Sequence, residues 1–521
     1  MHGVQWGGVA AVASLYAIFT IVGWYASRRA KSEGVAALML AGRSMPFWMA
    51  TVTMAATWID GGYLLGTAEG TFGSIASGWQ GGVCFGLSLL LGGVVFARRM
   101  RRLQFVTLVD PLTVRFGPRW AAVLALPAML GEVLWSAELL VAIGATFGVL
   151  LGVNLVTAIV VSAAVVTLYT MLGGMWSVGY TDTVQFALIP LGLLVVLPFA
   201  LASVGGWSVA WQEYAARQGT AADLFPPVAT AGYWSAPRIV SWWDLTIMLV
   251  FGGIPWNCYF QRIQSCQTPN KAAWHSIAAG LLTIVMTLPP LMLGVVAFTY
   301  RGWSPEAEAR LAASPTMALP LLLSQAVPPL VGILGLTAIV GAVTSSFSAS
   351  ILSAGSMISW NVVRGLLLPE LTPLAMKRLL RTSVVALGAG AVLLALRVES
   401  VQRLWFFTSD LVFVLVFPQL VYALFDPRAN TTGSVAAFCV SLVLRLGGGE
   451  EILGIPRIIP YDDLLRSWLG DGADWSEGVA NVTLFPVRTF AAVVGLVLLG
   501  GVSRLTARWD PPRPLPVPPS E

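Results

Sequence analysis

Long apolar segments, separated by short polar and basic stretches, follow one another along almost the whole chain. About 20 apolar residues are enough for a helix to cross the hydrocarbon core of a bilayer. About 13 such segments are expected, and they lie near residues 5–27, 46–72, 79–97, 120–151, 154–173, 182–204, 240–264, 272–299, 317–359, 382–398, 402–425, 432–446 and 487–505. The 317–359 segment is long enough for a helical hairpin arm plus one span. The pattern predicts an all-α integral membrane protein.

Composition agrees with this interpretation and excludes several classes of function. The chain is 57% hydrophobic and only 11% charged, whereas soluble domains carry about 25% charged residues. The net charge of +5 is spread over short clusters between apolar segments, so the expected partner is the lipid bilayer and not nucleic acid. The two histidines and four cysteines have no metal-ligand spacing, and no nucleophile–base pair is visible, so an enzyme is not expected. The N-terminus lacks a basic region and a cleavage site, so the first segment is expected to be a retained helix.

The second segment contains a stretch that is poorly suited to a continuous helix. The run TMAATWIDGGYLLGTAEG, residues 53–70, places Asp60 directly before Gly61 and Gly62. Each helical glycine costs about 1 kcal/mol relative to alanine, and a carboxylate at the bilayer centre costs about 2.5–3.5 kcal/mol. An unwound helix with carbonyls facing a cavity is therefore predicted, as in secondary transporters. The alternative is a glycine kink that only allows helices to pack closely.

Two further stretches bear on this prediction. The run FGGIPWNCYFQ, residues 251–261, combines paired glycines with Pro255, which removes a helix hydrogen bond. This second break lies five spans after the first, the spacing expected for an inverted repeat of five helices. The run GAVTSSFSASILS, residues 341–353, is rich in hydroxyl groups at membrane depth. These hydroxyls suit either close helix–helix contact or a sodium site.

These runs, taken in order, resemble the sodium/solute symporter family and are most similar to its high-affinity choline transporters. The resemblance covers about residues 5–505 and includes the further motifs YTDTVQ, GGIPWNCYFQR, GAVTSSFSASILSAGSM and LWFFTSDLVFVLVFPQL. It implies a leucine-transporter-type fold with two inverted five-helix repeats and sodium-coupled transport. The implied divisions are an extra N-terminal helix and inner loop at 1–45, repeats at 46–204 and 205–425, two extra helices at 426–505 and a proline-rich cytoplasmic tail at 506–521.

The resemblance also implies the ligands of the coupling ion. By position, sodium would bind the carbonyls of Ala56, Ile59 and Ala342 and the hydroxyls of Ser345 and Ser346. Asp182 matches a family acid near the inward sodium exit, although an acid near a helix N-terminus is also favoured by the macrodipole. Chloride dependence is a property of the choline transporters that these residues leave open.

An aromatic cage for the substrate follows from the same likeness. Trp58, Trp135, Trp256 and Trp405 match tryptophans that surround a quaternary ammonium in the choline transporters. Such a cation has no N–H group and is attracted to ring faces by about 2 kcal/mol or more per ring when desolvated. Phe85 replaces a tyrosine of the relatives, and Tyr63 is a further candidate for the cavity lining.

Two acids depart from the choline-transporter pattern. Asp60 stands where those relatives have a glycine and where monoamine transporters of the same fold place their amine-binding aspartate. Glu138 replaces a small residue and follows Trp135 by three positions, on the same helical face. Two acids would suit an amine, a diamine or a polyamine, or a second cation. Glu138 could instead be protonated or paired with a base, and Asp60 could hold a second sodium ion or a coupling proton.

The favoured hypothesis is a sodium-coupled symporter that imports a small organic cation by alternating access, with choline as the leading substrate and an amine, diamine or polyamine as the alternative. With the N-terminus outside and the C-terminus inside, most lysines and arginines, Arg262 among them, fall in predicted inner loops, as the positive-inside rule requires. A bacterial-type inner membrane is expected. A membrane sensor or receptor with a transporter fold is the rival from another class, and the lack of a soluble domain argues against it. A channel is a further rival. The sequence does not indicate an oligomeric state.

Overall fold

The secondary-structure elements of the described residues are helices. The computed structural model describes residues 5–28, 35–397, 401–450, 453–469 and 485–516. The first half of the chain forms α1 (Trp6–Ser27), α2 (Val35–Leu40), η2 (Ala41–Arg43), α3 (Phe47–Trp58), α4 (Gly61–Gly73), α5 (Ile75–Leu91), η3 (Gly92–Ala97), α6 (Arg98–Arg102), α7 (Val109–Phe116), α8 (Pro118–Leu151), α9 (Leu155–Ala202), α10 (Trp207–Gln218), η4 (Gly219–Ala222) and α11 (Ala236–Gly252). The second half forms α12 (Asn257–Ser265), α13 (Pro269–Met286), α14 (Leu288–Thr299), α15 (Pro305–Ala313), η5 (Pro315–Met317), α16 (Ala318–Gln325), α17 (Pro329–Met357), η6 (Ile358–Leu367), α18 (Pro373–Ala395), α19 (Val401–Leu411), η7 (Val412–Val416), α20 (Phe417–Phe425), α21 (Thr431–Gly447), α22 (Tyr461–Leu469) and α23 (Val487–Thr506).

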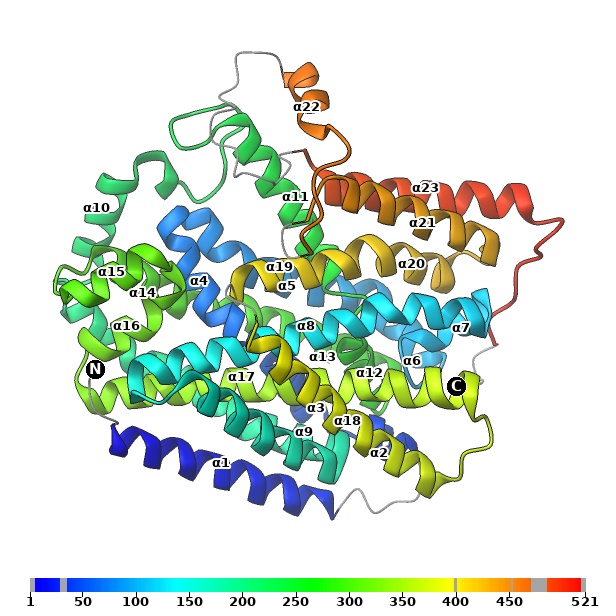
Figure 1. The fold of residues 1–521 in the computed structure, drawn as a ribbon, viewed down its shortest axis with the longest axis horizontal. Helices are drawn as coiled ribbons and strands as arrows, with labels where there is room; N and C mark the ends of the chain where they lie inside the picture. The colour runs from blue at the N-terminus through cyan, green and yellow to red at the C-terminus, as the bar shows by residue number, and fades with distance from the viewer. Residues whose placement is uncertain (1–4, 29–34, 398–400, 451–452, 470–484, 517–521) are drawn as a thin grey trace.

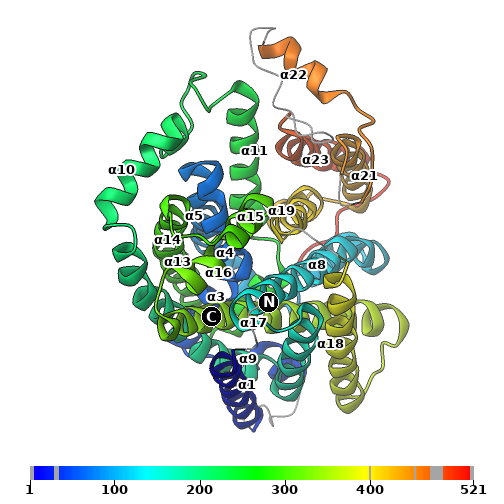
Figure 2. The same cartoon turned by 60° about the vertical axis from the view of Figure 1, so that its left-hand side comes forward.

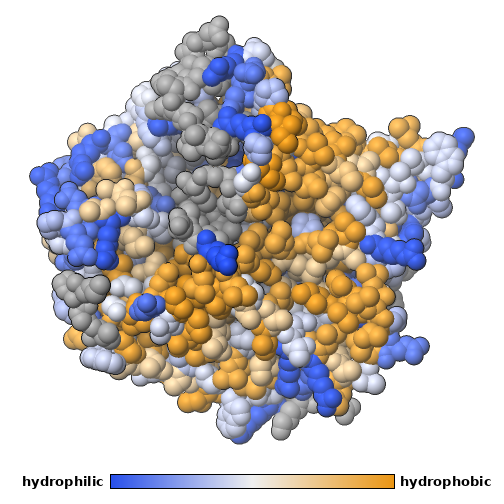
Figure 3. Space-filling model, viewed as in Figure 1, coloured by the Kyte–Doolittle hydropathy of each residue, from blue (hydrophilic) through white to orange (hydrophobic). Residues whose placement is uncertain are grey.

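Ten helices of the described chain are long and apolar enough to cross a membrane. The other three expected spans correspond to the interrupted pair α3–α4, to the second half of α9 and to the shorter apolar helix α21. On the face shown in Figure 3, apolar residues cover much of the middle and polar ones gather toward the edges. The protein is therefore an all-helical, multi-pass membrane protein, as predicted.

Helices α1, α8, α17 and α23 run roughly along the longest axis of the molecule, whereas α11 and α18 are inclined to it (Figures 1 and 2). Helix α17 packs against α8 and α9, and most residues of its apolar stretch are buried inside the protein. The beginning of α1 and the end of α23 lie at opposite ends of the molecule (Figure 1). The expected hairpin arm before the ninth span is also present, as α16 followed by α17.

The two spans expected at 154–173 and 182–204 are both present within α9. Two helices meet there at Gly174, whose backbone is not helical, and the second begins earlier than expected. Gly174 has φ +55°, and a Cβ atom there would lie 2.3 Å from the carbonyl oxygen of Leu38. A glycine allows this conformation because it has no side chain to clash. Tyr180 to Gln185 are consequently helical.

Candidate substrate and sodium sites

The predicted break in the second span is present. Helix α3 ends at Trp58, Ile59 leaves helical geometry, and Asp60 has extended backbone angles (φ −98°, ψ −171°) before α4 begins at Gly61. Asp60 caps α4, because its Oδ1 accepts a hydrogen bond from the backbone N–H of Tyr63 at 2.6 Å. The break is also a close approach, since a Cβ atom on Gly61 would lie 2.7 Å from Val343 Cγ2 on α17. The predicted break and a close approach between helices are therefore both present at these glycines.

The second predicted break is present as well. Helix α11 ends at Gly252, and α12 begins at Asn257 after Pro255. Trp256 occupies the N-cap position of α12 with extended backbone angles, and its indole Nε1 donates to the carbonyl of Gly252 at 2.8 Å. Both breaks therefore carry a tryptophan directly at the interruption.

The ring of Trp58 meets three other aromatic rings from separate segments of the chain. The Trp58 ring stacks on Phe85 of α5 at 5.2 Å between centroids and on Trp135 of α8 at 6.1 Å. Trp256 approaches edge-on, 6.2 Å from Trp58 and 5.4 Å from Trp135. We call these four residues the aromatic cage. They line a buried cavity together with Asp60 and with Thr408 and Ser409 of α19.

The cavity inside the cage is small. It measures about 10 Å³, which is room for about one water molecule. A larger ligand can enter only if the rings separate. Thr408 and Ser409 were not predicted as lining residues, although the motif LWFFTSD contains them. The side chain of Trp405, a predicted cage member in α19, lies outside the described part of the chain.

Asp60 lies at the edge of the cage with both carboxylate oxygens engaged. Its Oδ2 accepts a hydrogen bond from the indole Nε1 of Trp135 at 2.6 Å, while Oδ1 serves the α4 N-terminus. Asp60 thus orients one cage ring and places a carboxylate beside the cavity.

Tyr63 and Glu138 are placed differently from the cage. The hydroxyl of Tyr63 reaches the carbonyl of Thr283 at 2.5 Å and the hydroxyl of Thr287 at 2.8 Å, away from the residues that line the cavity. Glu138 is fully buried in α8 and does not line the cavity either. Within the described chain neither of its carboxylate oxygens has a hydrogen-bond partner, and Asp60 is the acid whose charge acts on it.

Oxygen atoms from α3 and α17 converge next to the first break. The Ser345 hydroxyl lies 2.8 Å from the carbonyl oxygen of Ala56 and 3.0 Å from that of Ala342. The Ser346 hydroxyl lies 3.4 Å from the Ala56 oxygen and 2.8 Å from the carbonyl oxygen of Thr57. Ile59 is buried at the end of α3. Uncharged oxygens of this kind are ligands that hard cations prefer. Four of the five residues implied as sodium ligands are thus in contact, and Thr57 adds one that was not foreseen.

Asp182 forms a buried ion pair that the sequence did not reveal. Its Oδ2 lies 3.5 Å from Nη2 of Arg262, and both side chains are almost fully buried. Arg262 also donates to the carbonyls of Thr53, at 3.2 Å, and Cys258, at 3.1 Å. The expectation that Arg262 belongs to an inner loop is wrong, because the residue lies inside α12. The helix macrodipole acts mainly on the first turn of a helix. Asp182 follows Gly174 by eight positions and therefore lies beyond that turn.

Comparisons with known proteins agree with this architecture. The profile of the Sodium:solute symporter family matches residues 38–441. The chain is 33% identical to a high-affinity choline transporter of Caenorhabditis elegans, with 96% of this chain and 88% of the relative aligned. It is 34% identical to that of Homo sapiens, with 94% and 83% aligned.

Solved structures share the fold at low sequence identity. A Na⁺-coupled sialic acid symporter superposes with a TM-score of 0.78 at 18% identity, covering 98% of this chain and 99% of the other. A nucleobase-cation-symport-1 family transporter superposes with a TM-score of 0.52 at 13% identity, covering 91% and 95%. The fold is therefore of the leucine-transporter type. Together with the family profile and the choline-transporter relatives, this means that the chain belongs to the sodium:solute symporter family and is a sodium-coupled transporter, not an enzyme.

Proposed function

We propose that this symporter imports choline together with sodium. The observation that carries the proposal is the aromatic cage, in which the Trp58 ring meets Phe85, Trp135 and Trp256. A quaternary ammonium offers no N–H group, so it binds ring faces and a nearby negative charge. The cage supplies the faces and Asp60 supplies the charge. The likeness to choline transporters over nearly the whole chain supports the same substrate.

Asp60 has a consistent role in this proposal. Both of its oxygens already accept hydrogen bonds from the protein, at 2.6 Å each. Each carboxylate oxygen can accept a further hydrogen bond, so an amine could share these oxygens, whereas a quaternary ammonium needs only the charge. Asp60 is therefore proposed as a long-range counter-charge that also holds Trp135 in place.

Sodium is proposed to bind the oxygens of Ala56, Ala342, Ser345 and Ser346, which link the broken helix to α17. Sodium at this position would stabilise the contact between α3 and α17, and so one conformation of the transport cycle. The family match supports sodium coupling and carries nothing for chloride, which the proposal leaves out. Asp182 is proposed to lie on the inward exit route, gated by Arg262.

The proposed orientation has the N-terminus outside and the C-terminus inside a bacterial-type inner membrane. The arginine-rich helix α6 then faces the cytoplasm, as the positive-inside rule expects. The division into inverted repeats at 46–204 and 205–425 stays a prediction.

A second candidate substrate is a diamine or polyamine. The supporting observation is Glu138, a fully buried acid without a hydrogen-bond partner among the described residues. An ionised carboxylate in such a place is costly unless a cation or a proton neutralises it. A second ammonium group could do so once the cage has opened.

A thermal-shift experiment on the purified protein separates these substrates. Choline, putrescine and spermidine are each tested in sodium and in potassium, with the wild type, Trp58→Leu and the control Trp274→Leu. Trp274 is exposed on α13, away from the cage. The proposal predicts a sodium-dependent shift with choline that weakens about 30-fold in concentration for Trp58→Leu and is kept in the control. A shift with the amines and none with choline would refute the choline assignment.

A further inference from the structure

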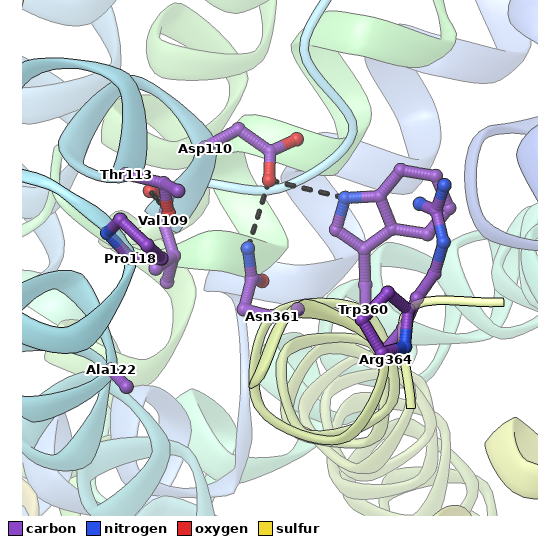
Figure 4. Close-up of a pocket in the computed structure, with 10 residues that line it drawn as sticks. Val109, Asp110, Thr113, Pro118, Ala122, Trp360, Asn361 and Arg364 are labelled. Carbon is purple, nitrogen blue, oxygen red and sulfur yellow. Dashed lines mark hydrogen bonds between the residues drawn. The ribbon is translucent and has the colours of Figure 1, made fainter. Parts of the chain in front are cut away.

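A second cavity shares no lining residue with the cavity inside the cage. It measures about 280 Å³ and is enclosed by α7, the start of α8 and the end of η6. Its lining includes Asp110, Pro118, Trp360 and Arg364 (Figure 4). In the proposed orientation this end of the molecule faces the cytoplasm. The cavity is large enough for a small polar group, and transport as described above does not use it.

Asp110 forms one wall of this cavity and is already occupied. Its Oδ1 accepts hydrogen bonds from Trp360 Nε1 at 3.1 Å and Asn361 Nδ2 at 2.8 Å (Figure 4). Its Oδ2 accepts from the backbone N–H groups of Val106 at 2.7 Å and Thr107 at 3.1 Å. The carboxylate therefore fixes the Trp360 ring and offers little to a cationic ligand.

Arg364 supplies a positive charge on the wall of the cavity that also carries the Asp110 carboxylate. Its guanidinium carbon lies 3.9 Å above the centre of the Trp360 ring, and the ring is held by Asp110. Within the described residues no acid forms an ion pair with Arg364. The stacked arginine also occupies the face of Trp360, so this ring is not available to a quaternary ammonium. The N–H groups of Arg364 lie in the plane of its guanidinium, so stacking on the ring leaves them free to donate hydrogen bonds.

The beginning of α8 adds donors on the opposite wall. Helix α8 starts at Pro118 after Gly117, and no side chain caps this end. The first backbone N–H groups of a helix lack intrahelical partners, and they carry the positive end of its dipole. Pro118 and Ala122 line the cavity, so the 34-residue helix directs this end toward it. The oxygens of Asp110 already accept hydrogen bonds from the protein, so the groups around the cavity that remain without partners are donors.

We propose that this cavity binds the phosphate of an anionic phospholipid of the adjacent leaflet. Phosphate suits the planar donor array of arginine and the N-terminus of a helix. A lipid is favoured over a soluble phosphate ester because exposed leucines lie beside the cavity, where η6 ends with Leu366 and Leu367 and Leu368 follows it. Acyl chains can lie on these leucines while the headgroup reaches Arg364.

The test is a thermal-shift titration of the delipidated full-length protein in detergent. The probes are dioleoyl-phosphatidylglycerol, dioleoylglycerol, which has the same chains without phosphate, and glycerol 3-phosphate, which has the phosphate without chains. The variants are Arg364→Gln and the control Arg378→Gln, an exposed arginine on α18. We expect phosphatidylglycerol to raise the melting temperature of the wild type and of the control. For Arg364→Gln the half-saturating concentration should rise about tenfold or more.

The sodium-dependent melting shift of each variant shows that it is folded, so a loss of the lipid response in Arg364→Gln is specific. Arg364→Lys, which keeps the charge but not the planar array, should fall between the wild type and Arg364→Gln. A response to glycerol 3-phosphate with the same dependence on Arg364 would contradict the lipid and assign the site to a soluble ester. An equal response of wild type and Arg364→Gln, or an equal response to dioleoylglycerol, would overturn the site itself.

Discussion

Replacing Asp60 by asparagine separates the two roles that the structure gives this residue. Asparagine caps a helix about as well as aspartate, so the bond from the Tyr63 N–H, 2.6 Å long in the wild type, can be kept. The second oxygen is then replaced by an NH₂ group, which faces the donor Nε1 of Trp135 and cannot accept its proton. The substitution therefore removes one charge and one charge-assisted hydrogen bond and leaves the broken helix capped.

The expected magnitude follows from these two losses. A carboxylate about 6 Å from a bound cation, at an effective dielectric constant of about 20, contributes about 3 kcal/mol. The half-saturating choline concentration should therefore rise about 100-fold in Asp60→Asn. Trp135→Phe keeps an aromatic face and the charge of Asp60 but lacks the indole N–H. A hydrogen bond to a charged group is worth about 1.5–3 kcal/mol, so this variant should lose stability while its choline affinity falls by less than in Asp60→Asn.

The assay is sodium-dependent choline binding by scintillation proximity, with melting temperatures recorded for the same samples. The double variant Asp60→Asn with Trp135→Phe completes a cycle, because the two residues are hydrogen-bonded partners. If Asp60 acted only by orienting Trp135, the two single variants and the double variant would bind choline with the same reduced affinity. That result, or unchanged affinity in Asp60→Asn, would refute the counter-charge role.

Three further predictions concern other groups around the site. Ser346→Ala should abolish the sodium-dependent rise in melting temperature. Ser348→Ala should keep this rise, because Ser348 is equally buried on α17 but its hydroxyl donates to a carbonyl of its own helix. A loss of the rise in both variants would contradict the assigned sodium ligands. Arg262→Met should destabilise the protein by about 3–5 kcal/mol in a denaturation experiment, because it leaves Asp182 as a buried unpaired charge. Adding Asp182→Asn should recover part of this loss, and no recovery would argue against a direct ion pair. Glu138→Gln should change choline affinity by less than about threefold, which is under about 1 kcal/mol, because Glu138 does not line the cavity. The same substitution should abolish any stabilisation by putrescine. A large loss of choline affinity would place Glu138 in the choline site.

The sequence was most informative where local chemistry conflicts with a continuous helix. Paired glycines beside Asp60, and paired glycines before Pro255, interrupt otherwise apolar spans, and both interruptions are present. The spans expected at 154–173 and 182–204 place a change of direction between them, but the sequence alone did not assign it to Gly174. The close approach that excludes a Cβ atom at Gly174 comes from Leu38, more than 130 residues earlier in the chain.

The pairing of polar groups could not be predicted for a related reason. The bond between Asp60 and Trp135 joins residues 75 positions apart, and the Asp182–Arg262 pair joins residues 80 positions apart. Arginines in membrane proteins usually mark inner loops, so Arg262 was assigned to one. The structure buries it because an acid on α9 and two carbonyls supply its partners.

Uptake into proteoliposomes tests whether a sodium gradient drives choline transport by this protein. Vesicles loaded with potassium are diluted into sodium or potassium buffer that contains labelled choline near the half-saturating concentration of the wild type, with Trp58→Leu in parallel. We expect wild-type vesicles in sodium to accumulate choline above its external concentration, no accumulation in potassium, and a strong reduction in the initial rate for Trp58→Leu that higher choline concentrations relieve. Choline that only equilibrates, or that enters equally in potassium, would contradict sodium-coupled choline transport.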